Sequence, residues 1–279
     1  MRAPSSDARA AATSRLAALA TPPGALGRLG DLAIWLSATQ GHVPPRPLDR
    51  VRLVIFAGDH GVARHGVSAY PPEITAAMVR TFVAGRAGVS ALAAAHEVSV
   101  RVLDLGVDDD LDGVPAEVQA HKIRRGSGAI HLEDALTHDE ARRAIAAGRR
   151  VAQEEIAAGA DLLLSGDMGI GNTTPSAALV AAALGLPASE VVGRGTGVDD
   201  AGLALKLAVV DAALRRAGDR TDDALETLVA LGSADLAAAT GFLLGAAEAG
   251  VPVLLDGLIS VACALTAERM APGAAAWFA

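Results

Sequence analysis

Residues 165–176 read Ser165-Gly166-Asp167-Met168-Gly169-Ile170-Gly171-Asn172-Thr173-Thr174-Pro175-Ser176, a glycine-rich turn with one carboxylate. The apolar run Leu162–Leu164 before it predicts a short buried strand. After it, Thr174 is a natural N-cap, Pro175 suits a first helical turn, and Ala177–Leu184 favour a helix. This order predicts a βα unit whose turn binds an anion, because turn amides and the helix dipole both favour negative charge. The spacing matches neither a P-loop, since no Lys follows the last glycine, nor the dinucleotide fingerprint.

The pattern of an apolar run followed by an aspartate occurs four times along the chain. The runs and their aspartates are Val54–Ala57 with Asp59, Val100–Leu103 with Asp104, Leu162–Leu164 with Asp167, and Val253–Leu255 with Asp256. Long helical patterns separate the runs, which is typical of an α/β protein with a mostly parallel sheet. Because ligands bind at the carboxyl ends of such strands, we expect the four aspartates to converge on one crevice.

Helix boundaries between these runs are well marked. Thr137 and Glu140 form a capping box, and Gly159 predicts the end of that helix. Ser233 predicts the start of a later helix that ends at Gly250. The helical segments are therefore specified locally, apart from small shifts of their ends.

Length and composition limit the class of protein. With 279 residues, of which 51% are hydrophobic, the chain can form a large α/β domain at residues 46–279 with a helical accessory segment at residues 1–45. The net charge of -8 repels phosphate backbones, and four Phe, two Trp and one Tyr provide little stacking surface. We therefore expect no nucleic-acid partner. Since the sequence has no apolar span of about 20 residues and no signal-peptide pattern, we also expect no membrane partner and a cytoplasmic location.

The segment Gly58-Asp59-His60-Gly61 follows a predicted strand, and its glycines allow a ligand to approach the backbone. Asp59 is a candidate substrate-binding residue. The alternative is an aspartate that caps a turn beside a solvent-facing His60. A metal site is not expected, because His60 and His65 lack a third ligand at suitable spacing.

Two further loops contain candidate binding residues. Ser68 and Tyr70 can line a pocket, although Ser68 lacks the setting of a nucleophile and Tyr70 can serve packing alone. The second loop, Gly193–Asp200, leads into a helix that carries Lys206. Arg194 or Lys206 can offset phosphate charge, whereas Asp199 or Asp200 is expected to cap the helix.

Seven motifs follow one another in a characteristic order. They are Pro22–Leu29, Gly58–Val62, Gly66–Pro71, Asp104–Val107, Gly169–Thr174, Gly193–Gly197 and Asp256–Gly257. With these motifs the chain resembles the nicotinate-nucleotide:dimethylbenzimidazole phosphoribosyltransferase family of cobalamin assembly. The resemblance implies a doubly wound, mostly parallel sheet with helices on both faces, a small helical accessory domain and a homodimer. It implies neither a metal nor another cofactor.

The resemblance also implies an activity and its site. The family transfers phosphoribose from nicotinate mononucleotide to 5,6-dimethylbenzimidazole, giving α-ribazole 5′-phosphate and nicotinate. The leaving pyridinium needs no acid, whereas the benzimidazole N–H needs a carboxylate as proton acceptor. On this basis Asp167 is expected to be catalytic. The expected substrate-binding residues are Asp59, Ser68, Tyr70, Met168, Gly169, Gly171, Asn172, Thr173, Thr174, Gly195, Thr196 and Lys206.

The chain departs from the family pattern in two ways. The family usually has Glu where this chain has Asp167. The family pattern also continues past residue 279 to a Gly-Glu-Gly motif with the carboxylate usually assigned as general base, and Glu268 does not match that motif. An alternative to the enzyme is therefore a catalytically silent protein that binds the nucleotide or the benzimidazole. A general binding scaffold would explain the βα pattern but not the ordered motifs.

Overall fold

The computed structural model describes residues 1–22 and 24–279, so Pro23 of the Pro22–Leu29 motif lies outside the described residues. The strands are β1 (Val51–Gly58), β2 (Ser99–Gly106), β3 (Leu162–Met168) and β4 (Val253–Leu254). The α-helices are α1 (Ser6–Ala17), α2 (Arg28–Gln40), α3 (Ile74–Val83), α4 (Gly88–Ala95), α5 (His138–Ala157), α6 (Thr173–Leu184), α7 (Ala188–Val191), α8 (Asp200–Ala217), α9 (Ala224–Leu231), α10 (Ala234–Ala249) and α11 (Gly257–Met270).

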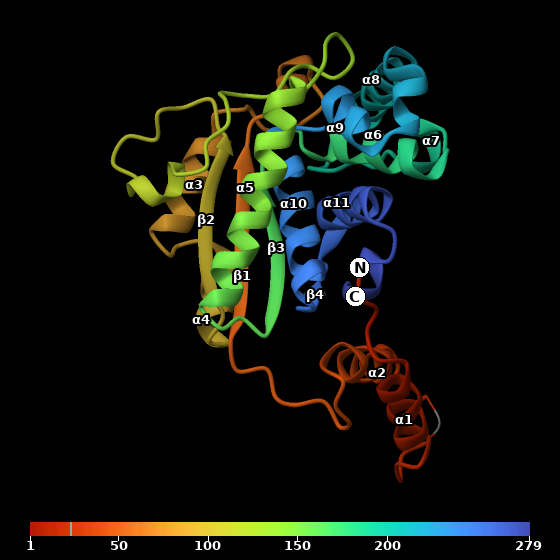
Figure 1. Ribbon diagram of the computed structural model, residues 1–279. Helices are drawn as coiled ribbons and strands as arrows, with labels where there is room; N and C mark the ends of the chain where they lie inside the picture. The colour runs from red at the N-terminus through yellow and green to blue at the C-terminus, as the bar shows by residue number, and fades with distance from the viewer. Residues whose placement is uncertain (23) are drawn as a thin grey trace.

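The four strands form one parallel sheet in the order β2-β1-β3-β4 (Figure 1). All four predicted strands are present, and the predicted parallel arrangement is confirmed. Asp104 and Asp167 lie within β2 and β3 and do not follow them as the sequence suggested. The reason is that β1 pairs with β3 as far as Ala57 and Met168, so the ladder continues through the glycine at 166.

Helices cover both faces of the sheet. On β1, Val54 and Phe56 join the large core cluster that includes α5 and α10, whereas Leu53, Ile55 and Ala57 join a second cluster that includes α3. Neighbouring β1 side chains thus bury themselves on opposite faces, which is typical of a parallel sheet inside an α/β protein. The doubly wound α/β fold is confirmed.

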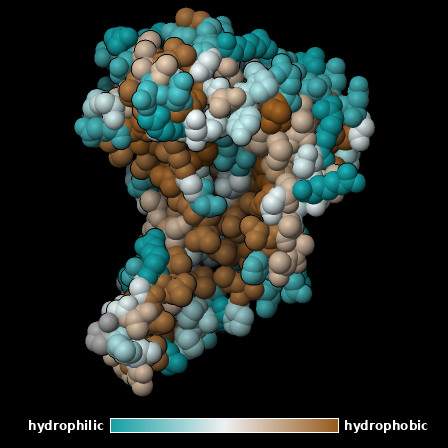
Figure 2. Space-filling model, turned by 180° about the vertical axis from the view of Figure 1, so that it is seen from behind, coloured by the Kyte–Doolittle hydropathy of each residue, from teal (hydrophilic) through white to brown (hydrophobic). Residues whose placement is uncertain are grey.

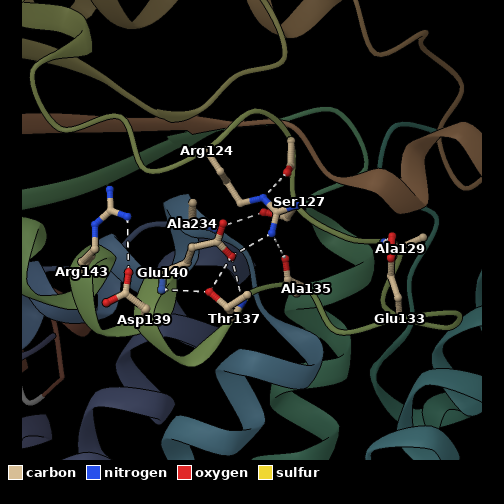
Figure 3. Close-up of polar contacts among 11 residues, drawn as sticks. Arg124, Ser127, Ala129, Glu133, Ala135, Thr137, Asp139, Glu140, Arg143 and Ala234 are labelled. Atoms are coloured by element: carbon tan, nitrogen blue, oxygen red, sulfur yellow. Dashed lines mark hydrogen bonds and ion pairs between the residues drawn. The ribbon is translucent and has the colours of Figure 1, made fainter.

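Helices α5 and α10 pack against each other at the centre of the protein. The capping box of Thr137 and Glu140 at the start of α5 is confirmed, and Arg124 donates to the same Glu140 carboxylate at 3.0 Å (Figure 3). Ser233 caps α10 as predicted. The two backbones meet closely, since a Cβ at Gly148 would collide with the carbonyl oxygen of Ala238. The absence of a side chain at Gly148 is therefore required by the position of α10.

Helices α1 and α2 form an arm that extends from the body (Figure 1). Residues 42–50 connect the arm to β1 without regular secondary structure. Two tryptophans tie the arm and the chain end together: Trp35 donates to the carbonyl of Ala276 at 3.2 Å, and Trp277 donates to the carbonyl of Arg2 at 2.9 Å. Within the described chain, no helix is long and apolar enough to cross a membrane.

The predicted N-cap at Thr174 is wrong. Helix α6 already begins at Thr173, and Asn172 stands at the cap position with helical backbone angles and no capping side chain. The Asn172 side chain instead donates from Nδ2 to Asp167. Thr174 is fully buried inside the first turn, and Pro175 occupies that turn as predicted.

Candidate functional site

Three loops meet beside the start of α6 and α8. Ser68 and Thr196 lie in contact through their hydroxyl groups at 3.3 Å, and Thr196 also accepts from the Ala69 N–H at 3.0 Å. A Cβ at Gly195 would lie 2.8 Å from both Lys206 Nζ and Thr173 Oγ1. The structure therefore brings together the predicted loops around residues 68, 173 and 195 with Lys206.

We call residues Gly169–Thr174 the anion corner. Three of its N–H groups already have acceptors inside the chain: Ile170 donates to Thr75 Oγ1, Asn172 to the Gly169 carbonyl, and Thr174 to the Gly171 carbonyl, each at 3.1 Å. Among the described residues, the N–H groups of Gly169, Gly171 and Thr173 have no acceptor. The corner thus offers three of its six amides to an anion, fewer than the sequence suggested.

Lys206 supplies a positive charge beside Thr173 of the anion corner. Its side chain is buried, and Nζ donates to Thr173 Oγ1 at 3.0 Å. Burial lowers the pKa of Lys206, and no carboxylate raises it again. Arg194, the other candidate cation, donates to Asp200 at 2.5 Å and to the carbonyl of Val198. Lys206 is therefore the cation that stays available for a phosphate group.

Asp167 lies near the end of β3 and accepts a hydrogen bond from Asn172 Nδ2 in the anion corner. Burial raises the pKa of Asp167 to about 6, and the charges of Asp235 and Asp256 act in the same direction. Asn172 and His60 act in the opposite direction. A carboxylate that ionises near neutral pH beside an anion site suits a catalytic role.

Asp59 and His60 lie at the end of β1. Asp59 Oδ2 accepts from the Asp108 N–H at 2.8 Å, and burial raises the pKa of this carboxyl group. His60 is 3% exposed, with its Nε2 3.5 Å from Oδ2 of Asp235. The alternative of a solvent-facing His60 is therefore wrong. His60 is buried because α10 covers the end of β1, a contact that the sequence alone does not reveal.

The expected convergence of four aspartates is wrong for Asp104. Its carboxylate lies 2.8 Å from Lys122 Nζ and accepts from the Val107 N–H at 2.8 Å. The charge of Asp256 raises the pKa of Asp167, and the charges of Asp59 and Asp167 raise the pKa of His60, so these aspartates do lie near one another. Asp104 instead fixes the start of the following segment.

The remaining predicted residues differ in exposure. The Tyr70 side chain is 55% exposed, so internal packing does not hold it, and its N–H donates to Ser68 Oγ at 3.2 Å. Met168 packs partly against the second core cluster. Asp199 caps α8 by accepting from the Gly202 N–H at 2.8 Å. Of the two predicted capping residues, Asp199 and Asp200, it is the first that caps the helix.

A cavity of about 650 Å³ is lined by residues of 59–65, 72–76 and 108–133, Asp59 and His60 among them, without residues of the anion corner. Charged side chains of its lining pair with one another: Asp108 lies 2.8 Å from Arg64 and 3.6 Å from Arg125. Over residues 1–22 and 24–279, no three His, Cys, Asp or Glu side chains form a group that could hold a metal ion.

The comparisons with known proteins agree with this geometry. A family model described as phosphoribosyltransferase matches residues 1–279. The chain belongs to this phosphoribosyltransferase family. Its relative from Mycolicibacterium paratuberculosis, named nicotinate-nucleotide--dimethylbenzimidazole phosphoribosyltransferase, is 54% identical over 269 residues, which are 96% of this chain and 76% of that protein. The protein of the same name from Mycobacterium tuberculosis is 53% identical over 275 residues, 99% of this chain and 76% of its own length.

Solved structures of the phosphoribosyltransferase family have the same fold. The crystal structure of CobT from Thermus thermophilus gives a TM-score of 0.90 at 45% identity and covers 98% of this chain and 81% of that one. A crystal structure of nicotinate-nucleotide-dimethylbenzimidazole phosphoribosyltransferase from the same organism gives 0.89 at 43% identity, with the same coverage. The fold and the family that the motifs implied are therefore confirmed.

Asp235 is the residue of this transferase that the sequence reasoning missed. It lies in the first turn of α10. Acidic residues are common there because they interact favourably with the helix dipole, usually at the protein surface. Here it is 1% exposed. The available signal was its context, because Asp235 is the single charged residue between Ser233 and Ala247 in a helix that is otherwise apolar or small.

Proposed function

We propose that the protein transfers the phosphoribosyl group of nicotinate mononucleotide to 5,6-dimethylbenzimidazole, which releases nicotinate and forms α-ribazole 5′-phosphate for cobalamin. The relatives' names support these substrates. The observation that carries the proposal is Lys206, a buried cation without a carboxylate partner beside the anion corner. Such a cation is costly to the folded protein unless a ligand makes use of its charge.

The reaction needs few groups from the protein. The bond from ribose C1′ to the nicotinate nitrogen breaks, and its electron pair goes to that nitrogen. A benzimidazole nitrogen forms the new bond to C1′, and the other nitrogen gives its proton to a carboxylate. Positive charge develops on the ribose during this exchange, and a nearby anion stabilises it. We assign this electrostatic role to Asp167.

The binding roles follow from the positions of the loops. Lys206 and the N–H groups of Gly171 and Thr173 would hold the phosphate, together with the rest of the anion corner as a rigid support. The neighbouring polar surface would contact the remainder of the substrates. Its members are Asp59, Ser68, Tyr70, Met168, Gly195 and Thr196.

Two measurements test the proposal. Calorimetric titration with nicotinate mononucleotide measures binding, and chromatography of a reaction with both substrates detects α-ribazole 5′-phosphate. The proposal expects binding and product. Binding without product would favour the silent nucleotide-binding protein. If neither binding nor product is observed, only the general binding scaffold is left.

We also propose a homodimer in the cytoplasm, with residues 1–45 as an accessory segment and residues 46–279 as the domain that carries the site. Hydrophobic side chains gather on the face between the arm and the body, which suits coverage by a second copy (Figure 2). Leu29 on α2 is 69% exposed, and Leu258 and Val261 on α11 are about 40% exposed. Analytical ultracentrifugation tests the dimer. The charged nucleotide substrate supports the cytoplasm as the site of action.

A further inference from the structure

His60 and Asp235 form an ion pair that has no access to solvent. Their side chains are 2% and 0% exposed, and the distance from His60 Nε2 to Asp235 Oδ2 is 3.5 Å. Among the described residues, neither side chain has a hydrogen-bond partner. An ionised carboxylate buried in this way is strongly unfavourable unless a positive charge lies beside it.

The surrounding backbone is shaped to admit this pair. A Cβ at Gly58 would lie 2.5 Å from Asp235 Oδ1, and a Cβ at Gly169 would lie 2.5 Å from His60 Nε2. The pair therefore occupies the space between the end of β1, the first residue of the anion corner and the start of α10. Any side chain at position 58 or 169 would displace it.

The start of α10 is held firmly in place. Ser233 caps the helix, and the N–H of Ala234 donates to Ser127 Oγ at 3.2 Å (Figure 3). Ser127 is tied in turn to β1, because its N–H donates to the Asp59 carbonyl at 2.7 Å. Asp235 thus lies in the first turn of α10, at the positive end of its helix dipole.

Acidic groups face the pair from each element packed around it. They are Asp59 just after β1, Asp167 on β3 and the Cys263 thiol on α11, while Asp256 after β4 acts on Asp167. Burial lowers the pKa of His60, but Asp235, Asp59 and Asp167 outweigh this effect, so the His60 pKa is raised. His60 is the single basic side chain within this group of acids.

We propose that His60 and Asp235 are positioning residues for the transfer reaction: Asp235 holds the buried His60 ring against Gly169, and the ring with its charge supports the Asp167 carboxylate and the anion corner from behind. This inference rests on the proposed function of Asp167. Neither residue touches the substrate, because both side chains are enclosed by protein. His60 acts through its positive charge, which lowers the pKa of Asp167, and through the position of the corner. Asp235 acts by holding His60 and raising the pKa of the ring, since its own charge raises the pKa of Asp167.

The first test observes His60 directly in the wild-type protein. Nitrogen-15 NMR of the histidine side chains at pH 7.5 should show an imidazolium, assigned to His60 by its loss in His60→Gln. The exposed His96 serves as the internal reference. A neutral His60 in the wild-type spectrum would overturn the inference, whether or not the protein makes α-ribazole 5′-phosphate, and this result requires no variant to be active.

The second test measures kinetics of His60→Gln with His96→Gln as the matched control. Loss of the imidazolium raises the pKa of Asp167, so the acid limb of the kcat profile should move to higher pH by about one unit. We therefore expect kcat to fall about twofold at pH 7 and about tenfold at pH 5, with KM for nicotinate mononucleotide within twofold. Asp235→Asn should abolish the imidazolium signal. An unshifted acid limb in a folded His60→Gln would contradict the inference, as would a change in KM alone.

Discussion

The anion corner with Lys206 and the segment 106–137 both lie at the carboxyl edge of the sheet, but they handle charge differently. The chain has two lysines, one in each region. Lys122 lies 2.8 Å from Asp104 and donates to the Asp109 carbonyl, so its charge is satisfied within the fold. Lys206 is buried with a threonine hydroxyl as its partner.

The aspartates differ in the same way. Asp108 and Asp109 each lie within 2.9 Å of an arginine, whereas Asp59, Asp167 and Asp235 share His60 as their nearby cation. Charges that are matched inside the chain stabilise a loop. Charges that are left unmatched near a backbone anion site lower stability and are available to substrate. The comparison supports the proposal that the anion corner is the reactive region of this edge.

The largest expected effect belongs to Asp167→Ala. Loss of the carboxylate that faces the ribose should lower kcat by about 100-fold or more, because charge stabilisation in an enclosed site has this magnitude. Steady-state kinetics with both substrates measures it. Asp110→Ala, in the region of matched charges, is the control and should keep kcat within twofold. Equal activity of Asp167→Ala and wild type would exclude Asp167 from the mechanism.

Lys206→Met should weaken nicotinate mononucleotide binding by about 10- to 100-fold, because it removes a charge-assisted contact to phosphate. It should also raise the melting temperature of the ligand-free protein, since a buried unmatched charge disappears. Lys122→Met is the matched control: it should leave affinity unchanged and lower the melting temperature, because Asp104 stays buried without its cation. Calorimetry and thermal unfolding measure both quantities. If the melting temperature changed in the same direction in both variants, the distinction between an unmatched Lys206 and a matched Lys122 would be contradicted.

The pH dependence should show the raised pKa of Asp167, about 6 against an ordinary 3.8. As pH falls below about 6, kcat should decline toward tenfold per unit, because the carboxylate becomes protonated. The unfolding free energy depends on pH in the opposite direction to kcat. The folded chain binds this proton more tightly than the unfolded chain, so the contribution of Asp167 to the unfolding free energy falls as pH rises from about 4 to 6.

Urea unfolding across this pH range, compared with Asp167→Asn, isolates the stability term. The variant should lack the decline that Asp167 causes in wild type. A kcat profile that stays flat down to pH 5 would show that Asp167 ionises as an ordinary aspartate.

The smallest expected effect lies among the matched charges. The pair of Arg80 and Asp109, at 2.7 Å, is partly exposed on both sides. A double-mutant cycle with Arg80→Ala and Asp109→Ala should give a coupling of about 0.2 to 1 kcal/mol in unfolding free energy, and no change in nucleotide affinity. A coupling that appears in affinity would place this pair in the reactive region.

Periodicity and capping signals were sufficient to predict the strands and several of the longer helices, but not α4, α7, α9 or α11. The four apolar runs are the four strands, and Thr137, Ser233 and Asp199 cap their helices as local chemistry requires. The error at Thr174 has a tertiary cause. Asn172 donates from Nδ2 to Asp167 on β3 and occupies the cap position, so the helix starts two residues earlier than the hydroxyl pattern suggests.

The site was predictable in part. The order of the motifs pointed to the loops that meet, including Thr196 with Ser68 and Lys206 with Thr173. Pairing between distant residues was not predictable, because Asp104 and Asp167 have the same local context. Which of them is matched by a lysine depends on how the chain returns after each strand. Asp235 was missed for the same reason, since its burial results from the close approach of β1.

The contact between α5 and α10 has a genetic consequence. Asp235 lies on α10, and the distance of α10 from α5 depends on the missing side chain at Gly148. A single added methyl group there would push the helix outward and carry the aspartate with it. Codons far from the ligand should consequently be as intolerant of substitution as those for residues that touch it.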